Sequence, residues 1–75
     1  NYNFVKKIVG DDSIIKVVID SKINYYKING NNIISIDKTD DYDYYIFVSG
    51  CVFNSIINKE TTAMEEYEKG NIKVT

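Results

Sequence analysis

The sequence predicts an α+β, β-rich fold with about five mostly antiparallel strands, in a meander or a small partly open barrel, plus one short C-terminal helix. Three observations lead to this class. Apolar and polar residues alternate with a period of two through the first half of the chain. The pair Asn29-Gly30 lies between two such segments. A helix-capping pattern, Thr62-x-x-Glu65, occurs only near the end. We therefore expect residues 1–75 to form a single β-rich domain.

The alternation predicts strands at residues 4–9, 14–19 and 23–28. It is clearest at 14–19, where Ile15, Val17 and Ile19 point to one face. Residues 20–22 are predicted to form a three-residue reversal. Asn29-Gly30 tolerates the positive φ angles of a type I′ turn, which would pair Tyr26 with Ile33 in a fourth strand at 31–36.

The predicted pairing defines two faces of this hairpin. The face expected in the core carries Val17 and Ile19 together with Ile23, Tyr25, Ile34 and Ile36. The opposite face carries Tyr26, Ile28 and Ile33. Either a helix or the second half of a barrel covers these three residues, or they form an exposed apolar patch for a partner or for self-association.

The second half of the chain contains an acidic loop, a central strand and the helix. Residues 37–43 are the loop, and 44–48 are apolar on both faces, as in a central strand. Residues 49–51 are expected to kink this strand before it continues at 52–53. The helix would start at Thr62 and end at Gly70. An edge strand is predicted at 71–75, with Ile72 and Val74 facing inward. The acidic residues in and before the helix are expected to face solvent: Glu60, Glu65, Glu66 and Glu68.

The residue types argue against catalysis. The chain has no His, so the usual general base is missing, and the single cysteine, Cys51, has no imidazole to activate it. Cys51 is predicted to be a small buried apolar residue, and one cysteine allows no internal disulfide, which fits a reducing compartment. One Cys without His cannot form a closed zinc site, and no phosphate-binding glycine loop is present. We expect a non-enzymatic protein with no cofactor and no metal.

Calcium is the one metal that the sequence leaves open. Oxygen-bearing side chains stand at alternate positions of the acidic loop, at Asp37, Thr39, Asp41 and Asp43. However, Tyr42 occupies the position of the loop glycine, and the bidentate glutamate is replaced by an apolar residue. The pattern favours a solvated loop over a calcium site.

Nucleic-acid binding is disfavoured by charge. Tyr25 and Tyr26 could stack on bases, and five lysines lie in the first half, at Lys6, Lys7, Lys16, Lys22 and Lys27. The net charge of −2 and the lack of arginine remove much of the electrostatic drive. A single-stranded nucleic-acid-binding small barrel is kept as an alternative.

The acidic, tyrosine-rich stretch favours binding to another protein. Tyrosine suits interfaces and carboxylates suit a basic partner, so the predicted contact residues are Asp40, Asp41, Tyr42, Asp43 and Tyr44. The alternative for Tyr44 is a half-buried strand position.

A concrete hypothesis is a small phage- or mobile-element-encoded inhibitor that occludes a basic, nucleic-acid-binding surface on a host or defence protein. An AT-rich coding sequence, indicated by Ile without Leu and Lys without Arg, suggests such an origin. We expect it in the cytoplasm of a bacterial host, since no apolar run is long enough to span a membrane. A structural, self-associating β domain, such as a homodimer, is the third alternative.

Overall fold

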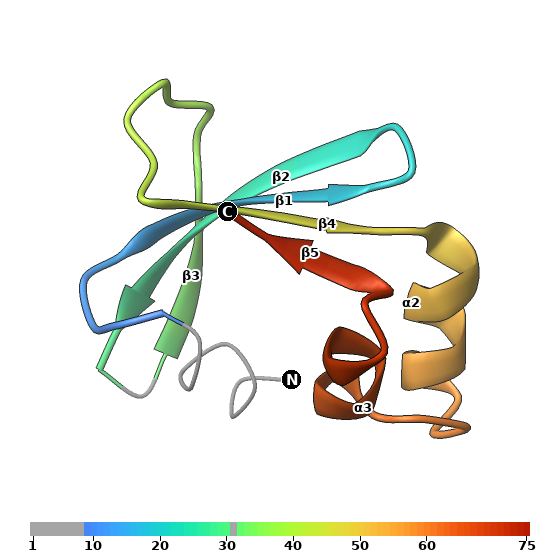
Figure 1. Ribbon diagram of the computed structural model, residues 1–75. Coiled ribbons are helices and arrows are strands. Elements are labelled where there is room, and N and C mark those ends of the chain that lie inside the picture. Colours follow the sequence, from blue (N-terminus) through green and yellow to red (C-terminus); the bar gives the residue numbers. More distant parts are fainter. Residues whose placement is uncertain (1–8, 31) are drawn as a thin grey trace.

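The computed structural model describes residues 9–30 and 32–75, in which five strands form one open sheet with helices on one side (Figure 1). The elements are β1 (Ile14–Ile19), β2 (Lys22–Asn29), β3 (Asn32–Ile36), β4 (Tyr44–Val48), α2 (Gly50–Ile57), α3 (Ala63–Glu68) and β5 (Ile72–Val74). This confirms the β-rich α+β class. The strand predicted at residues 4–9 lies outside the described residues, except for Val9.

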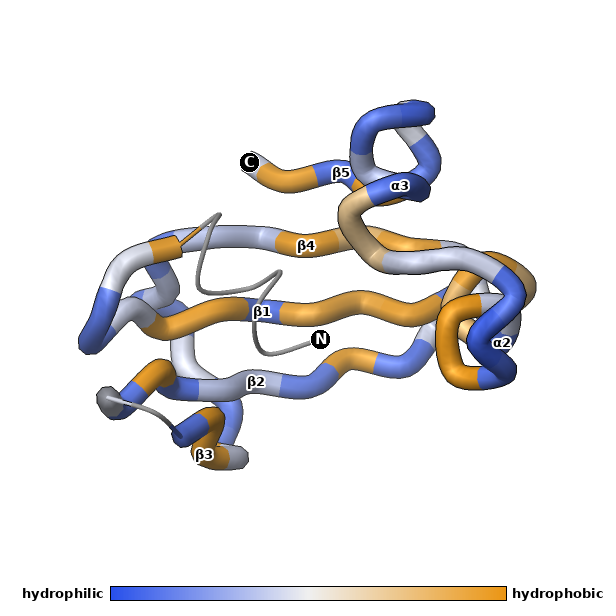
Figure 2. Tube along the Cα trace, turned by 90° about the horizontal axis from the view of Figure 1, so that it is seen from below, coloured by the Kyte–Doolittle hydropathy of each residue, from blue (hydrophilic) through white to orange (hydrophobic). Residues whose placement is uncertain are grey.

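The strand order is β3-β2-β1-β4-β5, and β1 and β4 are the parallel neighbours in an otherwise antiparallel sheet. Parallel neighbours need a long crossover connection. Here it consists of β2, β3 and the loop 37–43. Hydrophobic residues are frequent in β1 and β4, as the colouring of Figure 2 shows.

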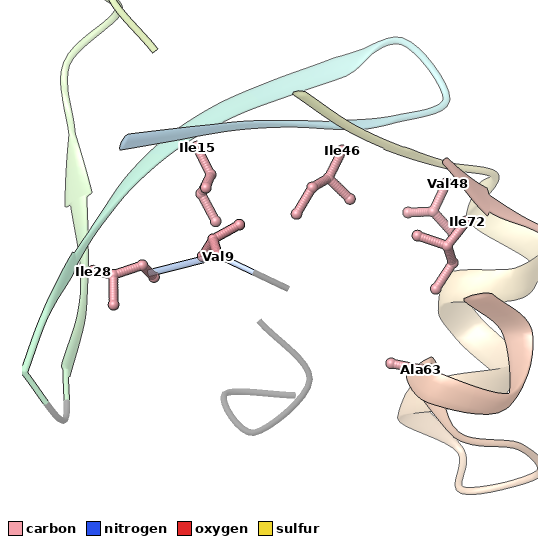
Figure 3. Close-up of a cluster of buried hydrophobic side chains, with 7 residues drawn as sticks. All are labelled: Val9, Ile15, Ile28, Ile46, Val48, Ala63 and Ile72. Atoms are coloured by element: carbon pink, nitrogen blue, oxygen red, sulfur yellow. The ribbon is translucent and has the colours of Figure 1, made fainter. Parts of the chain in front are cut away.

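The core lies between the sheet and the helices. Its buried cluster is Val9, Ile15, Ile28, Ile46, Val48, Ala63 and Ile72 (Figure 3). Ile15 and Ile28 are 1% and 0% exposed. Every second residue of a strand faces this side, so the strands contribute alternate residues to the cluster.

The reversal between β1 and β2 has two residues, not the three predicted. Ile19 pairs with Lys22, and Asp20 takes the left-handed backbone conformation with φ 54°. A register change of one residue moves every side chain of a strand to the other face. The prediction that Ile23 and Tyr25 share the core face with Ile19 is therefore wrong, and they lie on the opposite face.

The other face of the hairpin is the core face. Ile28 is fully buried and Tyr26 packs against the core, whereas Ile33 stays 37% exposed. The predicted exposed patch therefore reduces to Ile33. Ile28 pairs with Ile33 and Tyr26 with Ser35, two residues away from the predicted pairing, although the same residues share each face. Asn31, which follows Gly30 in the sequence, lies outside the described residues.

Helix α2 replaces the kinked strand predicted at residues 49–53. The Ser49 hydroxyl caps the helix by accepting a hydrogen bond from the Val52 N–H at 3.2 Å. Val52, Phe53 and Ile56 recur at helical spacing and pack against the core. Cys51, in the first turn, is exposed, so the prediction that it is buried is wrong.

The predicted C-terminal helix and edge strand are confirmed. The Thr62 hydroxyl accepts the Glu65 N–H at 3.1 Å and begins α3. Gly70 follows the helix with φ 85°, a conformation that glycine adopts without a steric penalty. In β5, Ile72 is buried and Val74 packs partly against the core.

Glu66 departs from the prediction of a fully solvated helix face, because it is only 7% exposed. Its carboxylate accepts hydrogen bonds from the Thr61 hydroxyl at 2.7 Å and the Asn71 amide at 2.9 Å, and Lys69 Nζ lies 3.5 Å away. The Thr61 hydroxyl contributes most to holding the pKa of Glu66 below its ordinary value of 4.5, followed by Asn71; burial acts in the opposite direction. The carboxylate thus ties both ends of α3 together.

Glu66→Gln is expected to reduce stability at neutral pH and to have little effect in acid. Because the folded-state pKa of Glu66 is lowered, its ionised form stabilises the fold above its ordinary pKa of 4.5, and this contribution is lost as the pH falls through the folded-state value. Urea denaturation of both proteins across the acid range would show the two stabilities converging. Glu68→Gln, an exposed change on the same helix, should leave stability nearly unchanged; a constant gap for Glu66→Gln would contradict the prediction.

Candidate functional site

The face of the sheet opposite α2 and α3, here called the open face, carries exposed apolar side chains. Register places Val18 beside Ile23 and Phe47 on this face, and Lys27 beside Ile34. Ile23, Ile34 and Phe47 are 52%, 41% and 39% exposed. In Figure 1 the helices lie on the other side, and the loop 37–43 (yellow-green) rises away from them. Among the described residues, the loop 37–43 is the segment that extends beside the open face.

Three tyrosine rings surround the ammonium of Lys16 on the open face. Lys16 Nζ lies 6.0 Å from the ring centroid of Tyr25, 5.3 Å from that of Tyr42 and 5.5 Å from that of Tyr45. The negative faces of aromatic rings attract a cation at such distances, each by about 0.5–1 kcal/mol at exposed sites. Tyr42 belongs to the loop 37–43, whereas Tyr25 and Tyr45 belong to β2 and β4. The lysine therefore holds the loop against the sheet.

The end of the loop is fixed by hydrogen bonds to the start of β1. Asp43 Oδ2 accepts the Ile14 N–H at 2.8 Å, and the Asp43 N–H donates to the Ile14 carbonyl at 2.8 Å. Within the loop, the Asp41 N–H donates to the Thr39 hydroxyl at 3.1 Å. The loop thus presents its remaining carboxylates from a fixed position.

The five predicted contact residues are divided between the surface and the core. Asp40, Asp41 and Tyr42 are exposed. The Asp43 carboxylate is engaged by the Ile14 N–H, and Tyr44 is half-buried and packs against the core. Asp40 and Asp41 therefore remain available to a partner, whereas the exposed Tyr42 ring already contacts Lys16.

A hollow of about 380 Å³ lies on the open face, between β2 and β3 and beside the acidic loop. Ile23, Tyr25 and Ile36 form the apolar part of its wall, and Asp37 and Lys38 line it where the loop begins. Asn24 and Ser35 add polar groups from β2 and β3. A recess that combines apolar and polar side chains is a candidate binding site. The hollow could hold an apolar side chain or a small apolar group.

The lysine and tyrosine residues of the nucleic-acid alternative do not form one surface. Tyr25 and Tyr26 point to opposite faces of the sheet, Tyr25 is buried, and Lys16 is enclosed by rings. Lys6 and Lys7 lie outside the described residues. Stacking of successive bases needs adjacent exposed rings on one surface, and these two tyrosines do not provide it.

Neither a metal site nor a membrane span emerges from residues 9–30 and 32–75. No three Cys, Asp or Glu side chains of these residues group in a way that could hold a metal ion. None of the helices in this part of the chain has the length and hydropathy needed to cross a bilayer.

Solved structures share this fold at low sequence identity. The chain is similar to a double mutant of the sec-alkyl sulfatase PisA1 (TM-score 0.67, 10% identity), covering 100% of this chain and 12% of the sulfatase chain. It is also similar to the ubiquinone synthesis protein UbiJ-SCP2 (TM-score 0.61, 10% identity, 87% of this chain and 58% of that one). A third likeness is to apo sterol carrier protein 2 from Yarrowia lipolytica (TM-score 0.55, 14% identity, 99% and 81%).

These likenesses establish the fold alone. The chain spans 12% of the sulfatase chain and 58% of the UbiJ-SCP2 chain. No protein-family model matches the sequence, and the curated proteins give no match.

Sequence reasoning placed Lys16 only in a possible basic patch, and it missed the tyrosine rings around Lys16 and the hollow. Both depend on Tyr25 lying on the same face as Lys16, which the two-residue reversal at Asp20-Ser21 determines. The available signal was Asp20, because aspartate is among the residues that tolerate positive φ in tight turns.

Proposed function

We propose that this domain is a non-enzymatic protein-binding module that engages a basic partner through the hollow and the adjoining acidic loop. The hollow carries the proposal, because it places apolar side chains beside Asp37, the first residue of the acidic loop. Interfaces concentrate their binding energy in apolar anchors that fill such recesses, with charged groups at the rim. Ile23, which lines the hollow, is 52% exposed.

The charge of the loop determines the kind of partner. Residues 37–43 contain four aspartates and one lysine. Asp37, Asp40 and Asp41 are exposed, and none forms an ion pair with another described residue. Such carboxylates speed encounter with a basic surface and disfavour an acidic one. A narrower form of the proposal is an inhibitor that occludes a nucleic-acid-binding surface of a host or defence protein, since such surfaces are basic.

Selection of a random peptide-display library on the immobilised domain tests the proposal. The expected peptides combine an aromatic or aliphatic residue with neighbouring Lys or Arg. The double change Asp40→Lys with Asp41→Lys should weaken their binding at least tenfold, and Ile23→Lys should do the same by placing a charge at the hollow. Thermal melts should be unchanged, because these three side chains are exposed.

The matched control is Glu60→Lys with Glu68→Lys, which makes the same charge change at two exposed residues away from the hollow. Peptide binding should survive it nearly unchanged. Selected peptides without basic residues, or equal losses in the control, would contradict the proposal. Asp43 is left intact because its carboxylate bonds the backbone of β1.

A second candidate function is binding of a small apolar ligand. The likeness to structures named as sterol carrier proteins and the apolar walls of the hollow favour it. Titration with a fluorescent fatty acid separates the two functions: saturable binding that Ile23→Lys abolishes and that Asp40→Lys with Asp41→Lys leaves unchanged favours the apolar ligand.

A further inference from the structure

The two edges of the sheet differ in their protection against pairing with another strand. β5 has three residues, and Lys73 stands at its centre. Short length and a lysine are common devices that keep an edge from pairing. β3 has five residues, Asn-Ile-Ile-Ser-Ile, with no charge and no proline, and four of the five are exposed. Within the described part of the chain, β3 forms the other edge of the sheet, and it has neither the short length nor the charged residue of β5.

The backbone of β3 offers hydrogen-bonding groups along its outer side. The Ile28 N–H donates to the Ser13 carbonyl, and the Ile28 carbonyl accepts the Asp12 N–H, both at 2.9 Å. Both backbone groups of Ile28 thus point away from its β3 partner, Ile33. In an antiparallel ladder the N–H and C=O of Ile33 must then point outward, and by alternation so must those of Ser35.

We infer that β3 pairs antiparallel with β3 of a second copy of this chain and joins the two sheets into one. The twofold axis passes between Ile34 of one copy and Ile34 of the other. In this register Ile33 faces Ser35 of the second copy, so both outward donors and both outward acceptors of each strand find partners. Ile34 faces Ile34 of the second copy and Asn32 faces Ile36. This is the register that pairs all of β3.

Side chains support a second copy as the occupant. Across the twofold axis like charges would face each other and repel, but β3 carries none. The isoleucines on both faces of the strand, Ile33 at 37% and Ile34 at 41% exposure, would each lose water-accessible surface. The strand is therefore compatible with its own copy on both faces. This inference does not depend on the proposed function, because it rests on the backbone groups and side chains of β3 and not on the hollow.

Light scattering coupled to size exclusion, at micromolar to millimolar protein, tests the inference. The wild type should show a concentration-dependent mass that rises to that of a dimer and no further. Ile34→Lys and Ser35→Pro should each be monomeric, the first by opposing two ammonium groups and the second by removing an outward N–H. Ile57→Lys, which changes a 55% exposed isoleucine on α2, should still dimerise. A wild type that is monomeric throughout, larger species, or a dimer that survives either β3 change would overturn the inference.

A disulfide test checks the register. In a Cys51→Ser background, Ile34→Cys would face itself across a pair without hydrogen bonds, at a Cα–Cα distance of about 4.5 Å, within the range that disulfides span. Mild oxidation should convert most of it to a covalent dimer. Ile33→Cys in the same background faces Ser35 and should remain largely monomeric on a non-reducing gel. Equal cross-linking of both variants, or none of Ile34→Cys, would refute this register.

Discussion

Ile28→Ala is expected to destabilise the domain by about 2–5 kcal/mol, the usual cost of truncating a fully buried isoleucine. Ile28 is 0% exposed, and its backbone is held to the segment before β1 by hydrogen bonds from Asp12 and to Ser13. The strand cannot collapse into the void that the change leaves, so the cavity persists. Small domains have folding free energies near the low end of about 5–15 kcal/mol, so the variant should be partly unfolded at room temperature.

Urea denaturation followed by circular dichroism measures this effect. Ile23→Ala is the matched control, because it is the same change on the same strand at a residue that is 52% exposed. Its cost should stay below about 1 kcal/mol. Similar losses at both positions would mean that β2 does not direct Ile28 into the core.

Gly50→Ala is expected to destabilise the domain by about 1–3 kcal/mol, although alanine favours helix over glycine. Gly50 is the first residue of α2, and its N–H donates to Asp20 Oδ1 at 2.9 Å. A Cβ atom at this position would overlap the Asp20 carboxylate at Oδ2. A side chain at residue 50 therefore requires the Asp20 carboxylate to move away and give up its hydrogen bond to the N–H of residue 50.

A double-mutant cycle tests this explanation. Asp20→Gly removes the carboxylate and keeps a residue that adopts the φ of 54° without strain. It should itself be destabilising, because the Gly50 N–H loses its acceptor. In that background, Gly50→Ala should no longer destabilise, and chemical denaturation of the four proteins gives the interaction free energy. Equal costs of Gly50→Ala in both backgrounds would exclude the Asp20 carboxylate as the cause.

Local sequence signals predicted the elements that depend on local chemistry. Thr62 caps α3 and Gly70 follows it, as the sequence indicated. Helix α2 was missed because Val52 and Phe53 favour strands when considered alone. Its stability comes from packing against the core and from the Asp20 carboxylate, which lies 30 residues away in the chain. Only the tertiary structure brings that carboxylate to Gly50.

Register explains which part of the site could be predicted. The acidic loop and the exposure of Asp40 and Asp41 follow from composition. The contact of Lys16 with Tyr25 and Tyr45 requires the pairing of three strands, which alternation alone does not determine. A period of two shows which residues share a face within one strand, but the length of each turn decides which faces of neighbouring strands coincide.

The parallel pairing of β1 with β4 also governs the order in which the domain folds. β1, β2 and β3 form two consecutive hairpins with short loops. Ile15 pairs with Tyr44 only after the chain between these two residues has closed into a loop. Contacts of such sequence separation slow folding. We expect the docking of β4 to limit the folding rate. During synthesis, Ile15 would then stay exposed to water in the preformed hairpins until the second half of the chain emerges.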